Sequence, residues 1–158
     1  MEEKIRKRKI VLVGTGFVGM SFAYSLLSEK GINELILIDM NKDKAVGEQM
    51  DLSDGLPYAD SKMTIKAGDY DECKDADIVV VTAGAAQKPG QTRLELVTIN
   101  AKITKDVATQ IKNSGFNGIM VVASNPVDIM TYVAYRASGL PKEHVIGSGT
   151  ILDTARLR

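Results

Sequence analysis

Short runs of consecutive aliphatic residues alternate along the chain with longer segments whose apolar positions recur every three or four residues. Continuous runs rich in Val and Ile are typical of strands covered on both faces of a sheet. The longer segments have the spacing of helices that pack one face against a sheet. The pattern predicts strands at residues 10–13, 35–38, 62–66, 78–82, 118–123 and 144–146.

The helical segments occupy the intervals between these strands, with glycines where two of them stop. The pattern predicts helices at residues 17–30, 42–52, 94–113 and 127–138, with a further helix beginning near residue 150. Strands that alternate with helices pair in parallel through right-handed crossovers. We therefore expect an α/β fold: a doubly wound parallel sheet with strand order 3-2-1-4-5-6, the Rossmann arrangement.

Composition narrows the function without defining it. The 158 residues are 44% hydrophobic and carry 20 basic and 20 acidic side chains, so net charge gives no attraction for nucleic acid or an anionic membrane. No apolar run approaches the roughly 20 residues of a membrane span, and the start lacks a signal-peptide pattern, so a cytoplasmic protein is expected. Cys73 is the only cysteine, which excludes an internal disulfide or a cysteine-based zinc site, and no metal is expected.

A glycine fingerprint follows the first predicted strand and opens the first predicted helix. Gly14 permits a tight turn, Gly16 allows a pyrophosphate to approach the backbone, and Gly19 lets helix and strand pack closely. The helix N-terminus supplies free N–H donors and partial positive charge for phosphate oxygens. The alternative is a glycine turn without a ligand.

Asp39 ends the second predicted strand, 20 residues after Gly19, where a carboxylate accepts hydrogen bonds from the adenosine ribose hydroxyls. A carboxylate there repels a 2′-phosphate, so NAD is expected as cofactor rather than NADP. The alternative role for Asp39 is an N-cap for the helix that follows it.

Three further segments carry a family resemblance. They are Ala83-Gly84-Ala85 with Gln87-Lys-Pro89-Gly90 and Thr92-Arg93-Leu94, then Ser124-Asn125-Pro126-Val127-Asp128, and finally Ile146-Gly-Ser-Gly-Thr-Ile-Leu-Asp153-Thr-Ala-Arg156. The first resembles the active-site lid of L-lactate dehydrogenases, within the lactate/malate dehydrogenase family, and the other two resemble the same family. The resemblance runs from Ile10 to Arg158.

The resemblance implies roles for the polar residues of these segments. Arg93 resembles the lid arginine that polarises the substrate ketone, a cation suited to a developing alkoxide. Gln87 resembles the specificity position, where malate dehydrogenases typically have an arginine for a second carboxylate. A neutral Gln leaves such a carboxylate unpaired, so lactate and pyruvate are favoured over malate and oxaloacetate. Asn125 resembles a residue that contacts the substrate and the nicotinamide.

The last segment resembles the part of the family's site that holds the substrate carboxylate. Arg156 resembles the arginine that binds this carboxylate in a two-pronged manner, and Asp153 the carboxylate that orients the catalytic histidine. The alternative is an ordinary i, i+3 ion pair. Arg158 resembles one half of the fructose bisphosphate site of allosteric bacterial enzymes. Further positions that resemble NAD contacts are Val18, Lys44, Tyr70, Gly84 and Ala85.

The resemblance also shows what this sequence lacks. The family's catalytic histidine lies well after the Asp-Arg helix, whereas the only histidine here is His144, before the sixth strand, where a loop or surface residue is expected. We expect residues 1–146 to form the NAD-binding domain and residues 147–158 to begin the helix that leads to the family's substrate domain, before which the chain is truncated.

Two functional hypotheses of different class follow. In the first, the chain is the cofactor half of an NAD-dependent L-lactate dehydrogenase, an oxidoreductase of glycolysis and fermentation, and is inactive alone without a proton-transfer group. In the second, it is a non-catalytic NAD(H)-binding module; a malate dehydrogenase-like fragment is a further variant. The partners expected are a small 2-hydroxy or 2-keto acid and, as in the family, further copies in a homo-oligomer, commonly a tetramer.

Overall fold

The chain folds around one parallel sheet, as the alternation of strands and helices predicts. A computed structural model describes residues 8–87, 89–149 and 151–158. The described strands pair in the order β3-β2-β1-β4-β5-β6, which confirms the expected topology. They are β1 (Lys9–Val13), β2 (Glu34–Ile38), β3 (Thr64–Ala67), β4 (Ile78–Val81), β5 (Ile119–Val122) and β6 (Val145–Gly147).

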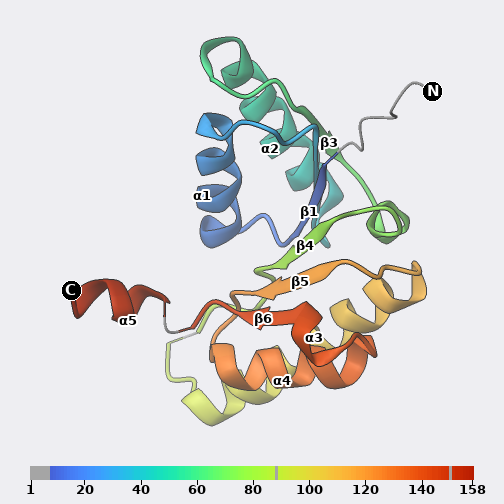
Figure 1. Cartoon of the computed structure of the whole chain (residues 1–158). Helices are drawn as coiled ribbons and strands as arrows, with labels where there is room; N and C mark the ends of the chain where they lie inside the picture. Colours follow the sequence, from blue (N-terminus) through green and yellow to red (C-terminus); the bar gives the residue numbers. More distant parts are fainter. Residues whose placement is uncertain (1–7, 88, 150) are drawn as a thin grey trace.

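The helices lie in two groups along this sheet. Figure 1 shows α1 and α2 beside the β1–β3 half, and α3 and α4 beside the half that contains β5 and β6. The described α-helices are α1 (Phe17–Ser25), α2 (Lys42–Gly55), α3 (Arg93–Asn113), α4 (Val127–Ser138) and α5 (Ile151–Arg156). None of the helices in the described part of the chain has the length and apolar character needed to cross a membrane.

The central strands separate two hydrophobic clusters, because successive side chains of a strand point to opposite faces. Val11 and Val13 of β1 belong to the cluster that contains Ile111 of α3 and Met130 of α4. Leu12, between them, belongs to the cluster that contains Ala23 of α1, Leu52 of α2 and the two leucines, Leu26 and Leu27, of the turn after α1. All five residues of β1 are buried, as expected for a strand covered on both faces.

Two of the predicted helices have the wrong C-terminal boundary. The first was expected to run to residue 30, but α1 ends at Ser25 and tightens into a 3₁₀ turn, Leu26–Ser28, which leaves both Leu26 and Leu27 buried. The second was expected to stop at residue 52, but α2 continues to Gly55. Its extension brings Leu56, one turn after the buried Leu52, against the same cluster.

The other differences are small shifts at element ends. The third strand begins at Thr64 rather than residue 62, and β6 begins at Val145 because residues Lys142–His144 form a 3₁₀ turn. The last helix, α5, spans six residues, Ile151–Arg156, and so begins close to the predicted position near residue 150. Element ends depend on local capping and tertiary contacts, which the hydrophobic pattern does not encode.

A buried lysine joins the start of β1 to the turn before β4. Lys9 has a side chain only 6% exposed, and its Nζ lies 2.6 Å from Glu72 Oε2 and 2.8 Å from Asp75 Oδ1. Burial by itself would lower the pKa of Lys9, but the hydrogen bonds to the two carboxylates outweigh it and raise the pKa. The hydrogen bond from Lys9 lowers the pKa of Asp75 against the weaker effect of burial.

These shifts predict a stability window in pH. The raised pKa of Lys9 contributes stability below the ordinary value of 10.5 that is lost as pH rises through the folded value. The lowered pKa of Asp75 contributes stability above 3.8 that is lost as pH falls through its folded value. We expect the difference in the free energy of unfolding between wild type and Lys9→Met, measured in urea, to be constant between these two pH limits. The difference should become smaller above the upper limit and below the lower one. A difference that stays constant from pH 3 to pH 11 would contradict this assignment.

Cys73 lies in the 3₁₀ turn Tyr70–Cys73 and is fully buried. Burial raises the pKa of its thiol to about 12, ahead of a lowering effect of Lys9. A thiol so far from ionisation is a poor nucleophile at neutral pH, so Cys73 has the properties of a core residue.

Candidate functional site

Most of the predicted cofactor-binding residues lie near the carboxyl ends of the parallel strands, whereas Asp153, Arg156 and Arg158 lie on or after α5. Gly14 follows β1, Asp39 follows β2, Thr82 follows β4 and Ala123 follows β5. The connection from β1 leads to β2 on one side, whereas that from β4 leads to β5 on the other. In open α/β sheets this reversal opens a crevice between the two central strands, where ligands bind.

Two glycines of the fingerprint are required by the fold itself. Gly14 has a φ of +104°, and a Cβ built on it would lie 2.7 Å from the backbone N of Ala83. A Cβ on Gly19 would lie 2.0 Å from Gly14 O and 2.8 Å from Thr82 Oγ1. Helix α1 can therefore lie against the turn only while residue 19 has no side chain.

Gly16 is different, because nothing in the described chain requires it to be glycine. Its φ is −75° and ψ −174°, which any residue adopts, and a Cβ built there meets nothing within 4 Å. The open space beside its backbone is where a pyrophosphate approaches in dinucleotide-binding turns. The turn therefore fits the cofactor that the fingerprint predicts.

The N-terminus of α1 is free of the side-chain caps that satisfy α2 and α3. Asn41 caps α2 by accepting from Lys44 N at 3.1 Å, and Thr92 and Glu95 form a capping box on α3. The N-cap of α1 is Gly16, which makes no side-chain hydrogen bond, and the first turn contains no acidic residue. The first N–H groups of α1 are thus available to an anion.

Asp39 is held beside this turn by hydrogen bonds to its carboxylate. Oδ2 accepts from Thr15 N at 2.8 Å and from Thr15 Oγ1 at 3.0 Å, and Oδ1 accepts from Asn41 N at 3.0 Å. Burial alone would raise the pKa of Asp39, but the bonds from Asn41 and Thr15, helped by Lys44, lower it. The helix cap of α2 is Asn41, so the capping alternative for Asp39 is wrong.

The carboxylate of Asp39 is therefore ionised at neutral pH and still has acceptor capacity, because two carboxylate oxygens offer about four sites and three are used. Lys44 lies on the first turn of α2 and is exposed, near enough to contribute to the lowered pKa of Asp39. The next residue, Met40, is fully exposed and offers an apolar surface beside the carboxylate.

Hydroxyl groups connect the ends of the central strands to one another. Thr82 Oγ1 donates to Gly14 O at 2.7 Å, joining the end of β4 to the end of β1. Ser124 Oγ donates to Ala83 O at 2.7 Å, joining the end of β5 to the loop after β4. With the Thr15–Asp39 bonds, these contacts link all four central strand ends.

The predicted lid loop is described except at Lys88. Gln87 is exposed, and its Nε2 donates to Gln91 O at 2.8 Å within the same loop. Arg93 is the first residue of α3, whereas its side chain lies outside the described part of the structure. The predicted substrate contact of Arg93 therefore stays a prediction.

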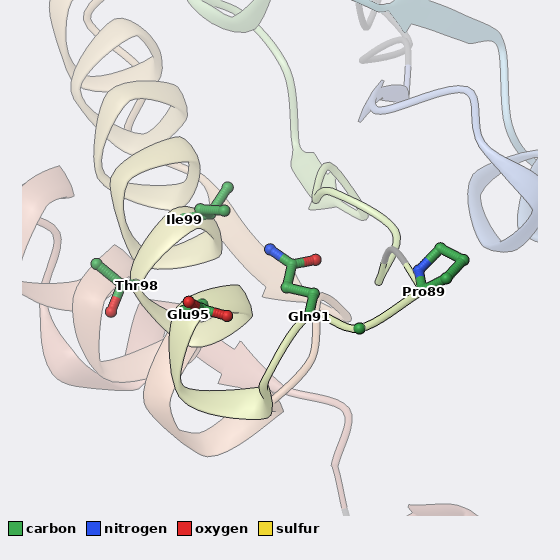
Figure 2. A pocket seen from close by; sticks show the side chains of 6 residues that line it. Pro89, Gln91, Glu95, Thr98 and Ile99 are labelled. Carbon is green, nitrogen blue, oxygen red and sulfur yellow. The ribbon is translucent and has the colours of Figure 1, made fainter.

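A hollow of about 620 Å³ lies between this loop and the first turns of α3. Figure 2 shows Pro89 and Gln91 on the loop side of it, with Glu95, Thr98 and Ile99 on the helix. None of the lining residues belongs to the glycine turn or to the Asp39 region. We therefore place the candidate site at the strand ends rather than in this hollow.

The predicted substrate anchor lies on α5. Arg156 Nη1 lies 3.4 Å from Asp153 Oδ1, with the two side chains 70% and 75% exposed. Figure 1 shows α5 extending away from the helices that cover the sheet. The ion pair itself is the one that the i, i+3 alternative describes, and an exposed pair of this kind contributes little stability. Arg158, the last residue, is also exposed.

The remaining predicted NAD contacts are spread along the strand ends. Val18, in the first turn of α1, is 61% exposed. Tyr70 packs partly against the core, and burial, followed by nearby acidic groups, raises its pKa to about 12. Gly84 and Asn125 are exposed, whereas Ala85 is half-buried and its N–H is bonded to the side chain of Asn100.

His144 lies just before β6, at the amino ends of the parallel strands and therefore opposite the glycine turn. It lines a second hollow, of about 650 Å³, together with residues that begin β1, β4 and β5. Its Nδ1 is buried without a hydrogen-bond partner among the described residues. The only histidine is therefore separated from the glycine turn and Asp39 by the length of the strands.

The sequence pattern did not identify four polar residues that organise the site: Thr15, Thr82, Asn100 and Ser124. Asn100 and the neighbouring Thr104 did leave a signal, because they interrupt the apolar stripe of a predicted helix. Thr15 and Thr82 left none, because a hydroxyl beside a glycine turn or a strand end is also common in solvated loops. Ser124 stood within a segment that resembles the family, but without a role of its own. Within the part of the chain that is described, no group of three or more His, Cys, Asp or Glu could hold a metal ion.

Comparison with known proteins identifies the class. Residues 8–147 match the family model for the NAD binding domain of lactate/malate dehydrogenases. L-lactate dehydrogenase 2 of Lactococcus lactis subsp. lactis is 57% identical over 155 residues, which are 98% of this chain and 49% of that protein. L-lactate dehydrogenase of Halalkalibacterium halodurans is 58% identical over 150 residues, 95% of this chain and 48% of the relative.

Solved structures agree with the sequence relatives. A lactate dehydrogenase from a Medee basin deep-sea metagenome library superposes with a TM-score of 0.91 at 58% identity, over 97% of this chain and 49% of that one. Malate dehydrogenase from Aeropyrum pernix gives a TM-score of 0.87 at 40% identity, over 94% of this chain and 48% of that one. The chain belongs to the lactate/malate dehydrogenase family. It spans about half the length of the curated relatives it matches.

Proposed function

We propose that this chain is the NAD-binding part of an L-lactate dehydrogenase, which interconverts lactate and pyruvate. The observation that carries the proposal is the turn at Gly16, where the fold leaves open space beside an uncapped helix N-terminus. Asp39 lies next to this turn, with free acceptor capacity for ribose hydroxyls. The exposed Met40 offers an apolar surface to the adenine ring.

In this proposal residues 1–146 hold the cofactor and residues 147–158 lead toward a substrate-binding part. The family model, which ends at residue 147, supports that division. When bound, NAD supplies the hydride acceptor or NADH the donor, and the chain's own residues bind and orient. Arg156 holds the carboxylate of the substrate, and Arg93 and Asn125 contact the keto or hydroxyl oxygen that reacts. Asp153 orients a proton-transfer group.

The neutral lid residue favours lactate over malate. Gln87 carries no charge and is exposed on the loop, so it offers no counter-ion to a second substrate carboxylate. The likeness to a malate dehydrogenase structure keeps the malate-like alternative in view, at lower identity than the lactate dehydrogenases. A binding module without catalysis would account for Gly16 and Asp39, but gives no role to the lid and the Asp153–Arg156 pair.

Three finer points belong to the same proposal. The whole protein acts in the cytoplasm as a homo-oligomer, commonly a tetramer in this family. Arg158 contributes one half of a fructose bisphosphate site. The exposure of Arg158 is compatible with that role.

A coenzyme titration tests the proposal. We expect NADH to bind the chain roughly 10- to 100-fold more tightly than NADPH, because a 2′-phosphate removes charge-assisted hydrogen bonds worth about 1.5–3 kcal/mol. Asp39→Asn should narrow this ratio, since the amide no longer repels the phosphate. Fluorescence titration of both coenzymes measures the change.

Asp43→Asn is the matched control. Asp43 lies in the first turn of α2, so the substitution removes one negative charge close to Asp39 in sequence and leaves the Asp39–Thr15 hydrogen bonds in place. It should leave the NADH to NADPH ratio as in wild type. Equal affinity of the wild-type chain for the two coenzymes would overturn the assignment of Asp39, and failure to bind either would overturn the proposed function.

A further inference from the structure

A buried asparagine of α3 bonds to both loops that follow the central strands β4 and β5. Asn100 Oδ1 accepts from Ala85 N at 2.8 Å, and Asn100 Nδ2 donates to Asn125 O at 3.2 Å. The residue is 4% exposed. The loops it connects are 40 residues apart in sequence and carry three of the residues predicted to contact cofactor or substrate, namely Gly84, Ala85 and Asn125.

Asn100 lies on the buried face of α3, where a polar side chain lowers stability unless it is hydrogen-bonded. The inward stripe of α3 contains Val107, Ala108 and Ile111, all buried in the hydrophobic cluster. A buried amide in such a stripe costs free energy unless its donor and acceptor are both paired. In Asn100 the acceptor pairs with one loop and the donor with the other. Because Ala85 offers an N–H and Asn125 a carbonyl, the orientation of the Asn100 amide is defined.

We infer that Asn100 is a positioning residue for the nicotinamide half of the dinucleotide. The inference rests on the proposed function and deepens it. In a doubly wound sheet the two mononucleotide halves of the ligand lie on either side of the switch point. The adenosine half belongs to the β1–β2 side, with Gly16 and Asp39, and the nicotinamide half belongs to the loops after β4 and β5. Asn100 holds these two loops at a set spacing and touches neither Gly16 nor Asp39.

The role of Asn100 differs from that of Ser124, which also connects these segments. Ser124 Oγ donates to Ala83 O, close to the strand end, where the sheet ladder already holds the backbone. Ala85 lies two residues further out, beyond the last described ladder bond of β4. The N–H of Ala85 therefore depends on Asn100 for its partner.

The test compares two ligands on the full 158-residue chain. Asn100→Leu keeps the approximate shape of the side chain and removes both hydrogen bonds, and Asn100→Ser is a milder second variant in case the first does not fold. NADH affinity is measured by fluorescence titration. ADP, which carries the adenosine and both phosphates, is measured by calorimetry. Thr104→Val is the matched control, because Thr104 is buried one turn further along α3 and its described hydroxyl bond goes to Met130 Sδ, at 3.3 Å, rather than to either loop.

We expect the Asn100 variants to lose about tenfold or more in NADH affinity, because loops that Asn100 no longer fixes must be ordered at the expense of binding free energy. ADP affinity should stay within about twofold of wild type, and Thr104→Val should change neither. The Ala85 amide should exchange its hydrogen faster in the Asn100 variants, as measured by NMR.

Each other outcome has a defined meaning. An equal loss of NADH and ADP affinity, or an unchanged NADH affinity in a folded Asn100 variant, would overturn the positioning role. Wild-type chain that binds neither ligand would instead overturn the proposed function. A comparable loss in Thr104→Val would assign the effect to the packing of α3 and also overturn the inference.

Discussion

Gly19→Ala is expected to destabilise the fold by more than about 3 kcal/mol, above the usual range for overpacking. The added Cβ would lie 2.0 Å from Gly14 O, a backbone atom that is held in turn by Thr82. Relief requires α1 to move away from the turn, which pulls Ala23 out of the core it shares with β1. Urea unfolding followed by circular dichroism measures the loss.

Gly16→Ala is the companion variant and should show the opposite profile. A Cβ on residue 16 meets nothing within 4 Å, so its free energy of unfolding should stay within about 0.5 kcal/mol of wild type. NADH affinity should nevertheless fall by about tenfold or more, because the methyl group occupies the space through which the pyrophosphate approaches. A Gly16→Ala chain with wild-type NADH affinity would show that the open space has no role in binding.

The second large effect is an absence of turnover: residues 1–158 should bind NADH without reducing pyruvate at a rate above the uncatalysed background. Asp153 has no histidine near it, because His144, the only histidine, lies at the amino ends of the strands. A proton-transfer group typically contributes a factor of about 10²–10⁴, and the positioning of substrate contributes more. NADH consumption followed by absorbance at saturating pyruvate measures the rate.

His144→Gln provides the control for this expectation. If a residual rate exists and is unchanged in His144→Gln, it comes from binding and the lid rather than from proton transfer by histidine. Measurable pyruvate reduction that disappears in His144→Gln would contradict the placement of His144 outside the site.

The sheet could be predicted from the sequence because its signal is local and repeated. Val11 and Leu12 of β1, like Val79 and Val80 of β4, are consecutive buried apolar positions, as expected for strands covered on both faces. The glycine turn could also be predicted from the sequence, since the positive φ of Gly14 and the close approach of Gly19 to Gly14 O arise within one strand-turn-helix unit. Asp39 was found by its distance from that unit along the chain.

The hydrogen bonds that connect the strand ends were harder to predict from the sequence, because their partners lie far apart along the chain. Thr82 bonds to Gly14, 68 residues earlier, and Asn100 reaches Ala85 and Asn125 at separations of 15 and 25 residues. No spacing rule connects such pairs before the fold is known. Arg156 and Gln87, by contrast, are each bonded close by in sequence, Arg156 to Asp153 and Gln87 to Gln91, and their predicted substrate roles stay predictions.

The row of hydrogen bonds along the strand ends separates two kinds of residue that a designer would treat differently. The side chains of Thr15, Thr82, Ser124 and Asn100 form hydrogen bonds within the protein, Thr15 to the carboxylate of Asp39 and the other three to backbone groups, so exchanging them changes the shape of the edge. Met40 and Val18 have exposed apolar side chains, so under the proposed function exchanging them changes the surface offered to the cofactor and leaves the shape of the edge intact. Under the proposed function, coenzyme affinity should therefore be adjustable at Met40 and Val18 with little loss of stability.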